Sequence, residues 1–278
     1  MQSFCAPSTV VDSFCEFKWQ GGRVRYELLG SLRVVRAGGC HTLSARKKEA
    51  LLAALLIRSG QVLSVDQLVD ELWADNPPCR ATAALHVYIS QLRNFLGPRG
   101  RRNSPIVTRS PGYLLDLGSD ELDFHVFQRL FREGRDLVRA QEHEEAVARF
   151  EAALGQWRGP ALGGVGEGRI VSGFVTWLEE LRLECIEMMV ASSLALGRDH
   201  ELIGFLYSLV SEHPLHEAFY ESLMTALHRT GRRADALRIY QRARDVLRHD
   251  LGLEPCRRLR ELHQAILTDD DGRVLAGR

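Results

Sequence analysis

Polar and small side chains line one face of a predicted helix over residues 80–96, and their types are those that bind DNA. In the string RATAALHVYISQLRNFL, Leu85, Ile89, Leu92 and Leu96 recur at helical spacing, so we expect them to face inward. The other face carries amides, hydroxyls and a few basic groups. Amides pair with base edges in the major groove, methyl groups contact thymine, and arginine binds guanine or phosphate. The face predicts binding to double-stranded DNA, although an ordinary amphipathic surface helix would show the same pattern.

The candidate DNA-binding residues of this helix lie on or beside its outward face. They are Arg80, Val87, Tyr88, Ser90, Gln91, Arg93 and Asn94. We expect Gln91 to read bases in the major groove, and Tyr88 and Arg93 to contact phosphate.

A predicted β-hairpin follows in the string IVTRSPGYLLDL, residues 106–117. Two β-rich runs flank a Ser-Pro-Gly turn, which is a hairpin signal. Its candidate DNA contacts are Thr108 to phosphate, Arg109 to bases from the tip, and Tyr113 just beyond the turn. A helix followed by a hairpin with a basic tip is the output end of a winged helix-turn-helix.

The elements that must position this helix and hairpin precede them. Residues 24–43 read as three short strands punctuated by glycines. Ser44 and Ser64 are expected to cap two helices, the second of which has Gln67 at the capping-box position. Asn76-Pro77-Pro78 prevents that helix from continuing. The order of three strands, three helices and a hairpin predicts a winged helix with an amino-terminal sheet.

After residue 120 the sequence reads as helices with a repeated signature. Small or apolar side chains recur at the same offsets around an aromatic or leucine. The three sets are Ala146, Phe150 and Ala153; Leu202, Leu206 and Leu209; and Ala236, Tyr240 and Ala243. The second and third sets are 34 residues apart, the tetratricopeptide period, and an insertion centred on GPALGGVGEG separates the first two. A generic helical bundle is the alternative.

The charge is divided between the two halves of the chain. Residues 1–118 carry 15 Lys and Arg against 9 Asp and Glu, a net charge of +6, whereas residues 119–278 carry 21 against 27, a net charge of −6. A basic amino-terminal half favours a polyanionic partner, and an acidic remainder favours contacts with protein.

Several classes of function have no support in the sequence. The six cysteines are scattered without a C-x-x-C pair, so we expect no structural metal and no disulfide framework, and a reducing cytoplasm fits. We find no signal peptide and no apolar run of about 20 residues that could span a membrane. The string GGVGEGR lacks the Gly-Lys-Ser/Thr of a phosphate loop, and no catalytic motif appears. We therefore expect no enzyme activity and no cofactor.

The strings LHVYISQLRNFLG and IVTRSPGYLL resemble the DNA-binding domain of OmpR-type response regulators. The residues that match the family pattern are Val87, Ile89, Leu92, Arg93, Arg109, Gly112 and Tyr113. The pair before Leu92 is often basic in that family but is Ser90-Gln91 here, so we expect weaker phosphate binding at this point.

Joined to a repeat-containing helical domain, this winged helix resembles the antibiotic regulatory proteins, the SARP family of transcriptional activators in actinomycete bacteria. Further family-like strings are ALLAALLIRSGQVLS, DELWADNPP, RGPAL and LGLEPCRRLRELHQAIL. The resemblance implies a mainly α fold with a small β component. It divides the chain into a leader (1–20), a winged helix (21–118), a bacterial transcriptional activator domain with tetratricopeptide-like helices (119–269) and a tail (270–278).

The resemblance also implies partners. Family members control secondary-metabolite gene clusters, and two protomers bind tandem direct repeats near the −35 element and hold RNA polymerase there. In OmpR-type domains the loop before the recognition helix faces the polymerase and its sigma factor. The corresponding candidates are Glu71, Trp73, Asp75, Asn76 and Pro77. A protein-interaction adaptor that uses only the helical repeats is the alternative, and a nucleotide-switched regulator is disfavoured by the missing phosphate loop.

Overall fold

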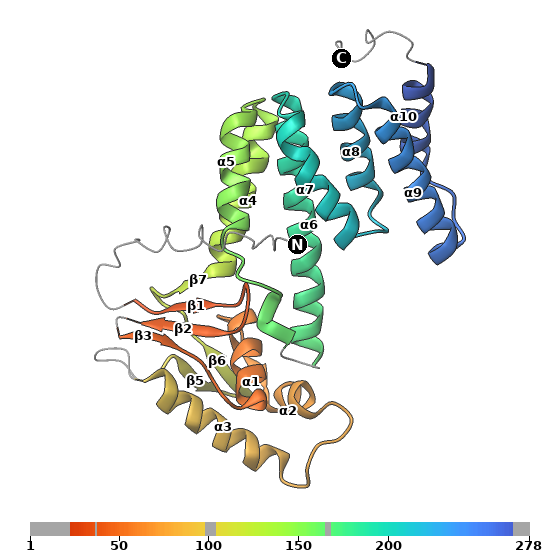
Figure 1. The fold of residues 1–278 in the computed structure, drawn as a ribbon. Coiled ribbons are helices and arrows are strands. Elements are labelled where there is room, and N and C mark those ends of the chain that lie inside the picture. The colour runs from red at the N-terminus through yellow and green to blue at the C-terminus, as the bar shows by residue number, and fades with distance from the viewer. Residues whose placement is uncertain (1–22, 37, 98–103, 165–167, 269–278) are drawn as a thin grey trace, which may run out of the picture. The chain divides into compact units, whose positions relative to one another are not determined.

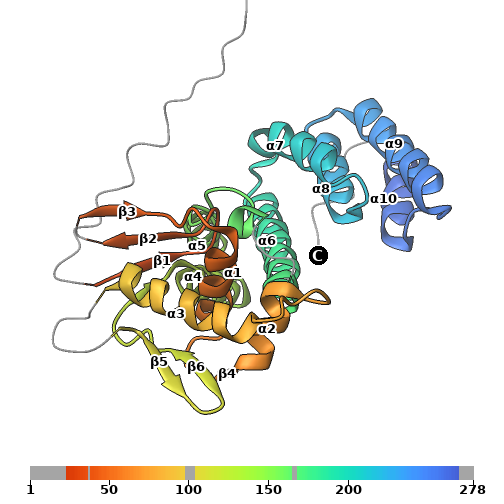
Figure 2. The same cartoon turned by 90° about the horizontal axis from the view of Figure 1, so that it is seen from below.

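The computed structural model describes residues 23–36, 38–97, 104–164 and 168–268 of the 278-residue chain. Two compact units divide it. Unit 1 comprises Met1–Val126 and Trp157–Thr176, and unit 2 comprises Phe127–Gln156 and Trp177–Arg278. The predicted leader and tail lie outside the described residues. Figures 1 and 2 show the elements of both units.

A four-stranded sheet opens unit 1, with the strand order β3-β2-β1-β7. Its strands are β1 (Arg25–Glu27), β2 (Arg33–Arg36), β3 (Gly39–His41) and β7 (Glu121–Leu122). The first three are antiparallel neighbours, as a meander of short connections predicts, and Tyr26 opposite Val34 points into the core. Strand β7 pairs in parallel with β1.

The division into units differs from the predicted boundary at residues 118 and 119. Strand β7 completes the first sheet, and residues 157–176 return to unit 1 as well. The backbone N–H groups of Arg158 and Leu162 donate to the carbonyl oxygens of Leu29 and Leu28, at 2.8 and 2.9 Å. The predicted insertion is therefore a part of unit 1, because it supplies partners for the backbone that follows β1.

Three helices form the centre of unit 1. They are α1 (Arg46–Ile57), α2 (Val65–Trp73) and α3 (Ala81–Leu96). The predicted capping box of α2 is confirmed, since Ser64 and Gln67 exchange side-chain and backbone hydrogen bonds. Ser44 does not cap α1, which starts one residue later, with Ala45 at the cap and no side-chain hydrogen bond. Buried leucines of α1, including Leu51 and Leu55, fill the core.

The predicted hairpin is present as β5 (Ile106–Arg109) and β6 (Gly112–Leu115), and β4 (Leu63–Ser64) extends it to a three-stranded sheet. Strand β4 ends at the cap of α2, so the hairpin and that helix share one anchoring point. Gly112 is required there, because a Cβ atom would lie 1.8 Å from the carbonyl oxygen of Leu63.

The described part of unit 2 is built from helices. Two of them, α4 and α6, begin in unit 1 and continue into unit 2. The helices are α4 (Asp123–Arg139), α5 (His143–Leu154), α6 (Arg169–Ala195), α7 (Asp199–Glu212), α8 (Glu217–Arg229), α9 (Arg233–Leu251) and α10 (Arg257–Thr268). All nine predicted signature positions of the repeats are buried. The repeat hypothesis is confirmed at the level of helix pairs and their packing.

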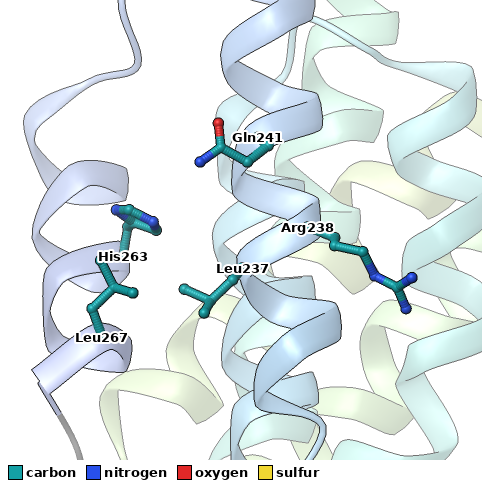
Figure 3. A pocket seen from close by; sticks show the side chains of 5 residues that line it. All are labelled: Leu237, Arg238, Gln241, His263 and Leu267. Carbon is teal, nitrogen blue, oxygen red and sulfur yellow. The ribbon is translucent and has the colours of Figure 1, made fainter.

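A cavity of about 320 Å³ lies between α9 and α10. Its lining residues are Leu237, Arg238, Gln241, His263 and Leu267 (Figure 3). It lies at the carboxy-terminal end of the repeats, where no further described helix follows to cover the last pair. Within the described ranges, no helix is both long and apolar enough to cross a membrane.

Candidate nucleic-acid interface

The outward face of α3 is exposed as predicted. Leu85, Ile89, Leu92 and Leu96 are buried in unit 1. The exposed residues of the helix and its amino-terminal cap include Arg80, Val87, Ser90, Gln91 and Asn94. Val87 has 52% of its surface exposed, which is unusual for a valine in a packed helix and leaves its methyl groups accessible to a partner.

The hairpin lies beside α3 (Figures 1 and 2), and Arg109 is the residue of β5 next to its turn. In the register of the hairpin Arg109 pairs with Gly112, so the arginine is the last residue of β5 before the turn. Thr108 and Arg109 are both exposed. Gly112 brings the start of β6 against β4, and the backbone N–H of Val65 donates to the carbonyl oxygen of Pro111 at 3.3 Å, so the turn of the hairpin is held against the start of α2.

Arg93 joins the hairpin to α3 by hydrogen bonds within the protein. Its Nε donates to the carbonyl oxygen of Ile106 at 3.1 Å, and its Nη2 donates to Oγ1 of Thr108 at 2.8 Å. The guanidinium carbon also lies 5.7 Å from the centre of the Tyr113 ring. These contacts make Arg93 a positioning residue for the wing, and its predicted contact with phosphate stays a prediction. Thr108 is the acceptor of one of these hydrogen bonds.

Tyr113 of β6 is only 8% exposed and packs against α3. The imidazole of His86 meets its ring edge to face, with 6.4 Å between the ring centres. The prediction that Tyr113 contacts DNA directly is corrected, because the ring is buried and packs the wing against α3. Tyr88 is half-buried, and its ring stacks against Trp73 of α2 at 6.1 Å.

The loop between α2 and α3 is exposed from Ala74 to Arg80, which includes the predicted polymerase contacts Asp75, Asn76 and Pro77. Trp73, at its start, is half-buried against Tyr88, and the Lys47 ammonium lies 5.9 Å from its indole. Ala74 has φ of 46° and ψ of −121°, a conformation that side-chain-bearing residues seldom adopt.

Glu71 does not reach the surface, so its predicted role as a polymerase contact is corrected. Its side chain is 5% exposed, and its two oxygens accept the backbone N–H groups of Ile170 and Val171, at 2.7 and 3.0 Å. The amphipathic pattern of α2 could not reveal this, because the partner lies about 100 residues away in the chain. A local signal of this contact is Gly168, directly before α6, because the absence of a side chain there lets the backbone approach Glu71.

A second buried carboxylate, Asp123 at the start of α4, stabilises unit 1. It accepts hydrogen bonds from the backbone N–H groups of Leu28 and Leu29 at 2.8 and 3.0 Å, and Nη2 of Arg158 lies 3.7 Å from it. Burial raises the pKa of Asp123 to about 6, although these hydrogen bonds and Arg158 act in the opposite direction. Among the described residues, no group of three His, Cys, Asp or Glu is arranged to hold a metal ion.

Comparisons with known proteins agree with this arrangement. The family described as "Bacterial transcriptional activator domain" matches residues 122–267, and the one described as "Transcriptional regulatory protein, C terminal" matches residues 41–115. Regulatory protein DnrI of Streptomyces peucetius is 36% identical over 255 residues, which cover 90% of this chain and 94% of that protein. Transcriptional regulator RedD of Streptomyces coelicolor is 36% identical over 253 residues, covering 90% and 72% respectively.

A solved structure of Mycobacterium tuberculosis EmbR, in complex with a low affinity phosphopeptide, has the same fold. The TM-score is 0.82 at 33% identity over 88% of this chain, which spans 65% of the EmbR chain. The activator-domain match covers more than half of the 278 residues, and DnrI is similar along nearly its whole length. The chain therefore belongs to the SARP family of transcriptional regulators, with an OmpR-type winged helix followed by a bacterial transcriptional activator domain.

Proposed function

We propose that this regulator is a sequence-specific DNA-binding activator, with α3 in the major groove and Arg109 of the wing on the flanking DNA. The observation that carries the proposal is the exposed face of α3 beside the hairpin, in which Arg109 is exposed next to the turn. Gln91 and Asn94 supply amides for base edges, Val87 supplies methyl groups, and Arg80 supplies positive charge. The net charge of +6 over residues 1–118 adds attraction for phosphate that does not depend on sequence.

The first prediction concerns base readout. Gln91→Ala or Arg109→Ala should each weaken binding to the cognate operator by roughly 1–3 kcal/mol and binding to random DNA by less, because base contacts specify and phosphate contacts do not. Fluorescence anisotropy on both DNAs measures the two effects. Arg129→Ala, which removes an exposed arginine of α4, is the control and should change neither affinity. Equal losses on both DNAs would reassign Gln91 and Arg109 to phosphate.

The proposed target is a pair of tandem direct repeats near the −35 element of a secondary-metabolite promoter, bound by two copies of the chain. This part rests on membership of the SARP family. DNase footprinting on the promoters that neighbour its own gene tests it. Two protected segments of the same orientation, one helical turn or a whole number of turns apart, are expected. An inverted pair would contradict the direct-repeat arrangement.

We propose that Asp75, Asn76 and Pro77 of the exposed loop contact the RNA polymerase holoenzyme, with Trp73 anchoring the loop. Two consecutive prolines restrict the free loop and reduce the ordering entropy of a protein contact. Asp75→Ala combined with Asn76→Ala should leave operator affinity within about 0.5 kcal/mol, as exposed substitutions usually do. Run-off transcription on the same template should fall severalfold. If operator affinity and transcription fell together, the loop would be needed for folding of the winged helix and not for contact with the polymerase.

A protein-interaction adaptor is the second candidate, and the cavity between α9 and α10 favours it. The lining is largely apolar and includes leucines of both helices, which suits a short peptide with apolar side chains (Figure 3). Binding to promoter DNA separates the two candidates. An activator binds with an affinity that falls steeply with salt concentration, whereas an adaptor shows little binding at any salt concentration.

A further inference from the structure

The carboxylate of Glu71 caps the first turn of α6, although about 100 residues separate the two in sequence. The first N–H groups of a helix have no partner within it, and the positive end of the helix dipole favours a negative charge there. Glu71 meets both needs, because each oxygen accepts one of these N–H groups and the side chain is buried. All the residues of this contact, Glu71, Ile170 and Val171, belong to unit 1.

Gly168 gives independent evidence of close fit at this point. It immediately precedes α6, and a Cβ atom there would lie 2.2 Å from Cδ of Glu71 and 2.4 Å from its carbonyl oxygen. No side chain fits in that space, because both neighbours belong to the ordered end of α2. The backbone before α6 and the end of α2 are therefore packed against each other.

The residues that follow Glu71 bind the end of α2 to two other helices. The Lys47 ammonium of α1 donates to the carbonyl oxygen of Leu72, and the indole of Trp73 stacks on Tyr88 of α3. Ala74, with its positive φ, comes next and starts the exposed loop. Three consecutive residues thus contact α6, α1 and α3, so the path on which the loop leaves α2 is fixed from three sides.

We propose that Glu71 is a positioning residue for activation, which sets the loop at Asp75–Pro77 through its contact with α6. The inference rests on the proposed function, in which this loop contacts the polymerase. The recognition surface has supports besides this contact, since α3 packs through its own leucine and isoleucine stripe and the wing is held by Arg93. Loosening Glu71 therefore changes how the loop is presented and leaves operator binding intact.

The test uses the full chain with two substitutions that disturb the contact from opposite sides. Glu71→Gln keeps the size of the side chain but turns one acceptor into a donor facing an N–H group. Gly168→Ala leaves Glu71 unchanged and forces the two backbones apart. Asp70→Asn is the matched control, because Asp70 is the exposed neighbour of Glu71 on the same helix.

Three readouts are compared on each protein: operator affinity, run-off transcription with the polymerase holoenzyme at saturating activator, and hydrogen exchange of the amides of residues 169–172. We expect Glu71→Gln and Gly168→Ala to bind the operator within about twofold of wild type, as changes away from the DNA surface do. Exchange should become faster, and transcription should fall by roughly fivefold, the scale of a lost helix cap. Asp70→Asn should match wild type in all three.

Suppose that both variants activate transcription as strongly as wild type while the amides of residues 169–172 exchange faster. Then α6 does not position the loop, and the inference is overturned. A parallel loss of operator binding and transcription would overturn it too, because Glu71 would then serve the whole winged helix. The Asp75→Ala and Asn76→Ala double variant separates this from the proposed function. If that variant activates normally, the polymerase contact itself is wrong, whatever the result for Glu71.

Discussion

Arg93 shows how a residue that matches a DNA-binding motif can work from inside the protein. Its guanidinium donates hydrogen bonds to a carbonyl oxygen and a hydroxyl of β5 and lies over Tyr113, so two of its five N–H groups are used within the protein. A planar, forked group is needed for this pair of bonds, and lysine does not replace it. Arg109 of the wing is exposed, and it is the residue of the hairpin for which we propose a contact with bases.

The two roles of Arg93 predict different outcomes for Arg93→Lys. A phosphate contact would survive, since lysine keeps the charge. If Arg93 positions the wing, operator affinity should fall by about 1–3 kcal/mol, the scale of lost hydrogen bonds to a charged group. Anisotropy on the operator and on an operator with altered bases at the wing measures affinity and discrimination together. Unchanged values for both would return Arg93 to the set of phosphate contacts.

At the scale of the elements, the α4–α5 pair depends on a glycine in the interior of a helix. A Cβ atom on Gly134 would lie 2.5 Å from Cε1 of Phe150, in the ring that α5 places against α4. Phe131 of α4 meets the same ring, with 5.9 Å between the centres. Glycine lowers the intrinsic stability of a helix, so its presence here is explained by the close approach it permits.

Gly134→Ala should therefore destabilise unit 2 by about 1–3 kcal/mol, because the ring of Phe150 has to move to accommodate the methyl group. Gly204→Ala is the matched control, since Gly204 is exposed on α7 and a Cβ atom there meets nothing within 4 Å. It should stabilise the protein by up to about 1 kcal/mol through helix propensity alone. Urea unfolding measures both, and destabilisation of equal size in the two variants would refute the packing argument.

At the scale of the whole molecule, Asp123 closes unit 1 across residues that are about 95 apart in the sequence. It joins the end of β1 to the start of α4, and Arg158 from the returning segment lies beside it. Because β7, Asp123 and this segment all belong to unit 1, a fragment that ends near residue 118 lacks part of the sheet and both buried-carboxylate contacts. DNA-binding experiments should therefore use the full chain.

The raised pKa of Asp123 makes its contribution to stability depend on pH. Its pKa is about 6 in the folded protein against an ordinary value of 3.8, so the folded state binds the proton more tightly than the unfolded state does. The resulting stabilisation is fully present below pH 3.8 and is lost as the pH rises through about 6. Over that window the loss is at most about 3 kcal/mol.

Asp123→Asn removes this titration, so the stability of wild type relative to the variant should fall as the pH rises from 4 to 7. Urea unfolding of both proteins at each pH gives the difference, in which the titration of the other carboxylates cancels. Hydrogen bonds from Leu28 and Leu29 favour the charged form. If the stability of wild type relative to the variant rose with pH, these hydrogen bonds would outweigh burial and the pKa of Asp123 would be lowered.

The sequence by itself determined the features that depend on neighbouring residues. The stripe Leu85, Ile89, Leu92 and Leu96 gave the face that α3 buries, and Ser64 with Gln67 gave the start of α2. The 34-residue period predicted which residues the helical repeats bury, and all nine signature positions are buried. These patterns are local, so they are visible without knowing where distant parts of the chain lie.

Only the tertiary structure decided which polar residues remain available to a partner. Glu71 and Arg93 look like surface charges in their own helices, but Glu71 caps α6 and Arg93 holds the wing. Asp123 and residues 157–176 lie beyond the predicted end of the winged helix at residue 118, yet they complete unit 1. The reason is that buried backbone N–H groups must find acceptors wherever the fold brings them, and the acceptors for α6 and for Leu28 and Leu29 come from about 95 to 100 residues away.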